Sequence, residues 1–351
     1  MAAVLTAHAR ATGGLSAPDR FVLRIALAAT LGFAVAILLD WEFSFLAPML
    51  AVNLIAAIPV SPPFRVGIAI PIVMYLATTA AFTVSAILVD APMVLIMIVG
   101  LVICWSFYGK RRGAPGVMML FVQIAFCGVP LFAATSLDLA RELAKWLQLS
   151  SLAAIAIVWV SHALIPAAAP PPRPAGARVA PPGLGPADAA RVAFTDTLVL
   201  LPLLVNFMLG GDINNFVILM ITINLLSAVE LAGSSRLAVG LLVGNTLGGV
   251  LAVLVQQFIL LNDSLALFLL TIFLAGLGFG SRLVRGGPAA PIFVLAFGTF
   301  ILLVGIAITP LPGGSEEAYV VRILKVGVAG AYGVGALSLV AWLRTRPAAR
   351  A

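Results

Sequence analysis

The sequence predicts an all-α polytopic membrane protein with twelve transmembrane helices, arranged as two parallel six-helix repeats. Composition is the first reason, because 62% of the 351 residues are hydrophobic and only 9% are charged, too few to cover a soluble core. The second is a series of apolar segments long enough to cross a bilayer. The third is a recurrence of landmarks: Arg65 follows Asn53 at the same spacing as Arg236 follows Asn224, 171 positions later.

The spanning segments can be located from hydropathy and length. A spanning helix needs about 20 apolar residues, because the hydrocarbon layer is about 30 Å thick and each residue rises about 1.5 Å. The segments that end at Ile58 and Val229 are short, which predicts that they are tilted, flanked by polar anchors or buried in protein. The expected spans are 21–39, 43–58, 66–89, 93–108, 116–134 and 147–165 in the first half, then 192–209, 216–229, 237–261, 265–281, 289–309 and 319–343 in the second.

A separate pattern precedes the sixth span. Apolar residues recur at helical spacing from Leu137 to Leu147, and charged residues occupy the opposite face. Such an amphipathic segment, residues 137–149, is expected to lie along the outer interface of the membrane.

Orientation follows from the short loops, because loops rich in Lys and Arg are retained in the cytoplasm. The alternation predicts cytoplasmic termini and, with six spans per half, two repeats of the same orientation. The basic side collects Arg10, Arg20, Arg24, Arg65, Lys110, Arg111, Arg112, Arg173, Arg178, Arg191, Arg236, Arg282, Arg285, Arg344, Arg346 and Arg350. The other side carries Asp40, Glu42, Asp90, Asp138, Glu142, Asp212, Asp263, Glu316 and Glu317, with only Arg141, Lys145, Arg322 and Lys325.

The predicted domain organisation has a proline-rich boundary between the halves. Seven prolines lie between positions 170 and 186, a composition that resists helix and favours an extended linker. The expected parts are a cytoplasmic N-terminal segment at 1–20, the first repeat at 21–166, the linker at 167–186, the second repeat at 187–343 and a cytoplasmic tail at 344–351.

Signatures of catalysis and of metal or nucleic-acid binding are missing from the sequence. There is no G-x-S-x-G, no H-E-x-x-H and no phosphate-binding glycine loop, and the only histidines are His8 and His162. Cys104 and Cys127 fall inside apolar segments, where we interpret them as small core residues. The net charge of +7 is dispersed through short loops rather than clustered among aromatics. We therefore expect no enzyme activity, cofactor, metal or nucleic-acid partner.

Two acidic residues are candidates for proton coupling. Asp196 lies inside the seventh span, where an ionisable side chain costs about 2.5 to 3.5 kcal/mol and tends to mark a pathway. Two interpretations stay open for it, a proton-accepting site and a structural ion pair with a neighbouring arginine. Glu230 is expected to be neutralised by Arg236 across a tight turn.

Polar residues elsewhere in the spans are candidates for substrate binding. Amides in membrane helices either line a pathway or hold helices together, and both roles stay open here. The candidate substrate-binding residues are Asn53, Arg65, Asn206, Asn224, Arg236 and Asn245. Gly240, Gly244 and Gly248 form a ridge that predicts close packing against another helix.

A family resemblance rests on the duplicated six-span unit, on an arginine that opens the span after a short cytoplasmic turn, and on a downstream run of small residues. In this chain the run extends from Arg236 through Gly244, Asn245, Thr246, Gly248 and Gly249. The pattern resembles the fusaric acid resistance and aromatic acid exporter superfamily over nearly the whole chain. Exporters of that superfamily often carry a large cytoplasmic domain, whereas this chain has only the proline linker, so it is more similar to a compact bacterial branch.

The resemblance implies a secondary exporter of small aromatic or amphipathic organic acids in the bacterial inner membrane. It also implies a periplasmic adaptor and an outer-membrane channel as partners, and homo-oligomerisation stays open. One alternative is a major facilitator, although residues Val60 to Arg65 lack the signature expected between its second and third spans. The other alternative is a membrane scaffold or assembly subunit that transports nothing.

Overall fold

The computed structural model is all-helical throughout the residues it describes, which are 15–166, 184–211, 213–232, 235–260, 264–285 and 287–308. Seven of its helices are long and apolar enough to cross a membrane, as expected for a polytopic membrane protein. The predicted twelfth span at 319–343 and most of the proline linker lie outside the described residues. The α-helices are α2 (Ala17–Leu38), α3 (Leu46–Ala57), α4 (Phe64–Ile87), α5 (Pro92–Arg111), α6 (Gly116–Ala133), α7 (Leu137–Leu164), α8 (Pro186–Gly210), α9 (Phe216–Ala232), α10 (Ser235–Leu260), α11 (Leu265–Arg285) and α12 (Ala290–Ile308), with short 3-10 helices η1 (Ile213–Asn215) and η2 (Gly287–Ala289).

Local sequence signals explain where several helices begin and end. Ser16 caps α2, since its Oγ accepts a hydrogen bond from the Asp19 amide at 3.3 Å. Proline occupies the first turn of α2, α5 and α8, where its missing N–H costs no helical hydrogen bond. Helix α8 ends at Gly210 and is followed by Gly211, whose left-handed φ of 64° suits glycine.

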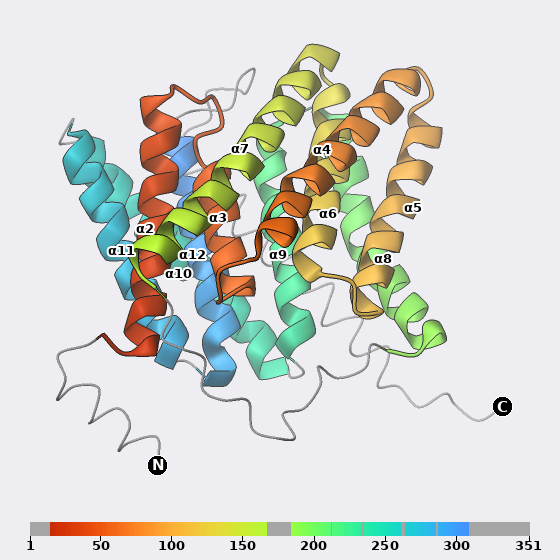
Figure 1. Ribbon diagram of the computed structural model, residues 1–351. Coiled ribbons are helices and arrows are strands. Elements are labelled where there is room, and N and C mark those ends of the chain that lie inside the picture. Colours follow the sequence, from red (N-terminus) through yellow and green to blue (C-terminus); the bar gives the residue numbers. More distant parts are fainter. Residues whose placement is uncertain are drawn as a thin grey trace.

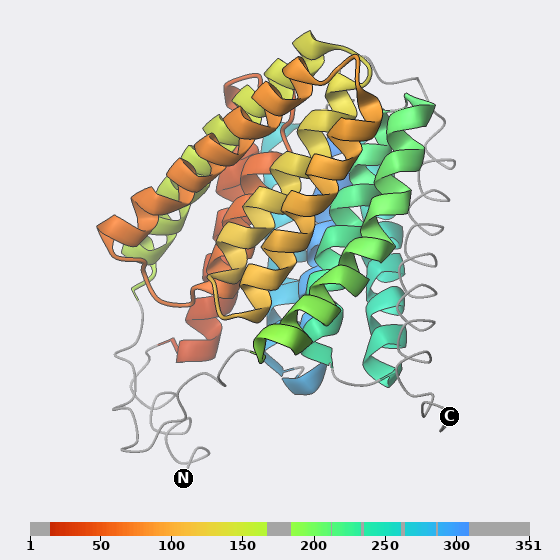
Figure 2. The same cartoon turned by 90° about the vertical axis from the view of Figure 1, so that its right-hand side faces the viewer.

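The helices form one bundle whose layers Figure 1 displays side by side. Helix α2 packs against α11 at one edge, and α5 packs against α8 at the other. Between these pairs, α3 contacts α12 and α6 contacts α9. Figure 2 shows α4 and α7 lying together, both inclined relative to α8.

The two ends of this bundle carry opposite charge. We call them the basic end and the acidic end. The basic end holds the described cations at helix termini, namely Arg20, Arg24, Arg65, Lys110, Arg111, Arg112, Arg191, Arg282 and Arg285. The acidic end holds Asp40, Glu42, Asp90, Asp138 and Glu142, together with Arg141 and Lys145.

The short helix α3 is buried in protein. It has 12 residues, too few to span a bilayer alone, and nine of them are buried. Tilting, polar anchors and burial in protein were the three explanations for its short apolar segment. The structure shows burial.

The amphipathic segment 137–149 is not a separate interfacial helix, and that prediction was wrong. It forms the first part of α7, a continuous helix of 28 residues. Leu143 and Leu147 are fully buried, because α7 packs against α3, α4 and α6. The charged face of α7 stays exposed, with Lys145 and Glu142 forming an ion pair of 2.6 Å. The apolar stripe is thus covered by protein rather than by lipid.

The predicted glycine ridge on α10 is confirmed as a packing surface. A Cβ at Gly244 would approach the carbonyl oxygen of Ile292 to 2.8 Å, and a Cβ at Gly248 would collide with the backbone of Ala296. These contacts bring α10 and α12 close together, as small residues do in membrane helix pairs.

One buried arginine joins three helix ends at the basic end. Arg24 in α2 is only 3% exposed, and its Nε donates to the carbonyl oxygen of Ile165 at 2.8 Å. Its Nη1 donates to the carbonyl oxygen of Pro59 at 3.0 Å. Both acceptors follow helix C-termini, so a cation also suits the local dipoles of α7 and α3.

Candidate functional site

A cavity of about 660 Å³ lies at the basic end, between the central helices α3, α6, α9 and α12 and the start of α4. This volume is within the range of about 300 to 1,000 Å³ typical of small-molecule sites. Most of its wall is apolar. The lining side chains include Met49, Ala56, Ile58, Val66, Ile70, Val117, Met118, Leu120, Met220, Ile221, Val294, Leu295 and Leu302.

Two predicted asparagines meet in this cavity. Asn53 comes from α3 and Asn224 from α9, and both side chains line the cavity. The Nδ2 of Asn224 donates to the Met220 carbonyl oxygen at 2.8 Å within its own helix. The side chain of Asn53 makes no hydrogen bond to any residue that the structure describes. Its amide is therefore placed to bind a polar group of a ligand.

A third amide, that of Asn245, contacts a lining residue of the cavity from the side away from the cavity. Thr299 of α12 lines the cavity, and its Oγ1 donates to Oδ1 of Asn245 at 2.5 Å. Asn245 is 2% exposed, so it positions the threonine rather than contacting a ligand. Of the two roles that the sequence left open, this contact matches helix packing, because it joins α10 to α12 while Asn245 itself is not among the lining residues.

The cavity has a positively charged corner. Lys110, near the end of α5, is one lining residue, and the α6 N-terminus supplies Pro115 and Gly116. No side chain in the described part of the protein caps that helix start by a hydrogen bond. Ala290 brings the α12 N-terminus to the same cavity. Helix N-termini carry partial positive charge, so this corner favours an anionic group while the remaining wall favours an apolar one.

A series of three residues recurs along α3 and α9, and its last two members line the cavity in each half. Phenylalanine, methionine and asparagine follow one another at four-residue spacing, as Phe45, Met49 and Asn53 in the first half. Phe216, Met220 and Asn224 repeat the series 171 positions later. Residues four apart share one helix face. Sequence reasoning singled out the asparagines alone, although this spacing was visible in the sequence.

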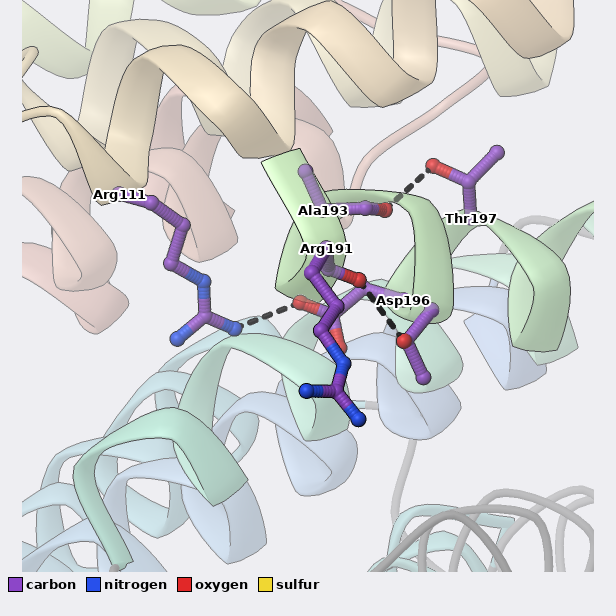
Figure 3. Close-up of polar contacts among 6 residues, drawn as sticks. Arg111, Arg191, Ala193, Asp196 and Thr197 are labelled. Carbon is purple, nitrogen blue, oxygen red and sulfur yellow. Dashed lines mark hydrogen bonds and ion pairs between the residues drawn. The ribbon is translucent and has the colours of Figure 1, made fainter. Parts of the chain in front are cut away.

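Asp196 forms a buried ion pair next to this region. Its Oδ2 lies 2.6 Å from Nη2 of Arg111, the last residue of α5. Figure 3 shows that the pair bridges two helices, with Arg191 of the same helix as Asp196 taking no part in it. The hydroxyl of Thr197 donates into its own helix, to the Ala193 carbonyl oxygen at 2.8 Å. This geometry matches the ion-pair interpretation, with an arginine distant in sequence as the partner.

The other sequence candidates lie elsewhere. Arg65 is exposed at the start of α4, and Asn206 is exposed on α8; neither is among the lining residues. The side chains of Glu230 and Arg236, and hence their expected pairing, lie outside the described part of the chain.

Lys110 and Thr299 are two polar lining residues that sequence reasoning missed. Lys110 was interpreted only as a topology signal in a cationic loop, and Thr299 stands alone in an apolar span. Their position beside the cavity depends on which helices pack together, so the sequence offered no direct signal for either.

Comparison with known protein families matches part of the chain. Residues 22–161 are similar to a family described as "Protein of unknown function (DUF2955)". No curated protein and no solved structure matches the chain. The similar region contains α3 and α5, so it includes Asn53 and Lys110 of the cavity wall.

Proposed function

We propose that this protein is a secondary transporter that exports small aromatic or amphipathic organic acids across the bacterial inner membrane. The observation that carries the proposal is the shared cavity, to which both halves contribute the same methionine and asparagine from equivalent helix positions. Transporters built from repeats place their substrate sites at the interface between the repeats.

The arrangement of helices supports two six-helix repeats. The contacts of α4 with α6 recur in those of α10 with α12, six helices later. The contact of α2 with α11 corresponds to that of α8 with α5, because α8 is the equivalent of α2 in the second half and α5 is the equivalent of α11 in the first. An approximate two-fold axis along the bundle would generate such pairs.

The chemistry of the wall supports an amphipathic acid. Three methionines supply adaptable apolar contacts, as at binding surfaces that accept several shapes. Lys110 and the two helix N-termini supply the complement for a carboxylate. Cations around the basic end would also raise the local concentration of organic anions.

The proposal further assigns the basic end to the cytoplasm and proton coupling to Asp196, with Glu230 as a second candidate. Protonation of Asp196 would dissolve its ion pair with Arg111 and so loosen α5 from α8. The resemblance to the fusaric acid resistance and aromatic acid exporter superfamily supports a periplasmic adaptor and an outer-membrane channel as partners.

A flux measurement with paired probes tests the proposal. Inverted membrane vesicles containing the protein are energised with a proton gradient and given radiolabelled benzoate or its neutral isostere benzamide. We expect protein-dependent accumulation of benzoate and none of benzamide, since only the acid matches the cationic corner of the cavity. Equal movement of both probes, or movement of neither, would contradict the proposal.

A further inference from the structure

The acidic end of the central helices is closed by phenylalanine side chains. Phe43, Phe45, Phe132 and Phe216 are all fully buried there. The Phe132 ring lies 5.9 Å from that of Phe43 and 5.6 Å from that of Phe216, between ring centroids. Phe43 and Phe45 are 6.3 Å apart. These rings form a continuous apolar layer that joins the ends of α3, α6 and α9.

Two contacts in this layer are reciprocal between the halves. Phe45 of the first half packs on Gly305 of α12, where an added Cβ would collide with the Cβ of Phe45. Phe216 of the second half packs on Gly128 of α6, where an added Cβ would lie 2.6 Å from the ring. Phe45 and Phe216 are the first members of the repeated series on α3 and α9. Each half therefore places one phenylalanine on a glycine of the other half.

The layer lies directly beyond the inner limit of the cavity. Met49 and Met220 line the cavity, and Phe45 and Phe216 follow one helical turn nearer the acidic end. Four residues of helix rise by about 6 Å. A ligand at the methionines is thus separated from the acidic end by the phenylalanine layer.

We infer that Phe45 and Phe216, seated on Gly305 and Gly128, form the outer gate of the transport pathway, closed in this structure while the cavity lies at the basic end. The inference rests on the proposed transport function. Alternating access requires the closed side to separate as the halves rock against each other. At Gly128 the contact is made by the Phe216 ring, whereas at Gly305 it is made by the Cβ and backbone of Phe45. Beside it, the Ser44 Oγ donates a hydrogen bond to the Gly305 carbonyl oxygen at 3.3 Å. Opening these two contacts therefore costs van der Waals packing and one hydrogen bond, with no ion pair between the described residues to break.

Accessibility of a cavity cysteine tests this gate without reference to any substrate. Met49→Cys is introduced after Cys104→Ala and Cys127→Ala, and right-side-out vesicles are treated with a membrane-impermeant maleimide. Glu42→Cys at the exposed acidic end calibrates which side the reagent reaches. We expect slow labelling of Met49→Cys alone and several-fold faster labelling when Phe45→Ala and Phe216→Ala are added, because both substitutions remove a ring from the layer although Phe45→Ala keeps the Cβ that contacts Gly305.

The matched control is Phe33→Ala, which truncates an equally buried phenylalanine in the contact between α2 and α11. It should leave Met49→Cys as protected as before. Should the double alanine variant be missing from the membrane, Gly128→Ala serves instead, because its methyl group displaces the Phe216 ring.

The outcomes separate the gate from the proposed function. Unchanged labelling in both gate variants, or equal acceleration by Phe33→Ala, overturns the gate, and benzoate flux measured in the parent protein judges the function independently. Faster labelling confined to the gate variants supports the gate even if the parent protein moves no benzoate. In that case the proposed substrate class is wrong and the gate stands.

Discussion

Arg111 and Asp196 form an ion pair of 2.6 Å between α5 and α8, and their side chains are only 12% and 7% exposed. The two helices belong to different predicted halves, so the pair also holds the halves together near the basic end. Removing one member of such a pair leaves the other charge in a low-dielectric environment without its partner.

Asp196→Asn is expected to lower the membrane abundance of the protein. The asparagine keeps the shape but removes the carboxylate charge that lies 2.6 Å from the buried Arg111 guanidinium, and breaking such a buried pair costs about 3 to 5 kcal/mol. Thermal unfolding of the detergent-purified protein would show a matching loss. The double variant Arg111→Met with Asp196→Leu should recover most of the stability, because it removes both charges together.

The same variant separates the two roles of Asp196. Normal abundance with loss of proton-driven flux would assign the carboxyl to proton coupling instead. A variant normal in both abundance and flux would leave Asp196 with neither role.

Asn53→Leu and Asn224→Leu should weaken substrate binding while leaving abundance unchanged. Each replaces a lining amide by an apolar side chain of similar size, and loss of a hydrogen bond to a charged ligand costs about 1.5 to 3 kcal/mol. Binding of benzoate to the purified protein is therefore expected to weaken by about tenfold or more. Asn206→Leu on the exposed face of α8 is the matched control and should bind as the parent does. Equal losses in all three would refute the assignment of the cavity.

Much of the fold could be predicted because hydropathy and the residues that start and end helices are local properties of the sequence. The expected span at 116–134 corresponds to Gly116–Ala133, and that at 66–89 to Phe64–Ile87. Hydropathy failed at α7, where charged residues on one face interrupted the apolar run although the helix continues. A pattern of one exposed and one buried face does not reveal whether lipid or protein covers the apolar side.

The candidate site could be predicted only in part, because it depends on which helices pack together. Asn53 and Asn224 were found from their equivalent spacing, which duplication makes visible in the sequence. Asp196 was found as an acid in an apolar span, but its partner Arg111 lies 85 residues away in sequence. Only the contact between α5 and α8 brings the two together.

Arg65→Lys should leave benzoate flux unchanged. The sequence had placed Arg65 among the substrate-binding residues, where a planar guanidinium would hold a carboxylate through two hydrogen bonds that lysine cannot reproduce. In the structure Arg65 is exposed and outside the cavity lining, so a positive charge suffices there. Flux at the parental rate is the expected result in energised vesicles. A large loss would show that Arg65 contacts substrate during transport.

Gly248→Ala should destabilise the protein, and Gly249→Ala should not. A methyl group at Gly248 collides with the backbone of Ala296, whereas one at Gly249 lies 3.6 Å from Leu303, an ordinary contact. Overpacking of this kind costs about 1 to 3 kcal/mol. Thermal unfolding of the two variants in one detergent makes the comparison, with neighbouring positions on the same helix. Equal melting temperatures would contradict the close approach of α10 and α12.

The final prediction concerns orientation, which sets the direction of every flux measurement above. Cationic loops stay in the cytoplasm, so the basic end is expected inside and the acidic end outside. Cysteines are introduced singly at four exposed positions in a protein carrying Cys104→Ala and Cys127→Ala. We expect Glu42→Cys and Asp90→Cys to react with an impermeant maleimide in right-side-out vesicles, and Arg112→Cys and Arg285→Cys to react only in inverted vesicles. The reverse pattern would place the cavity mouth outside, so that the proposed exporter would have to be an importer.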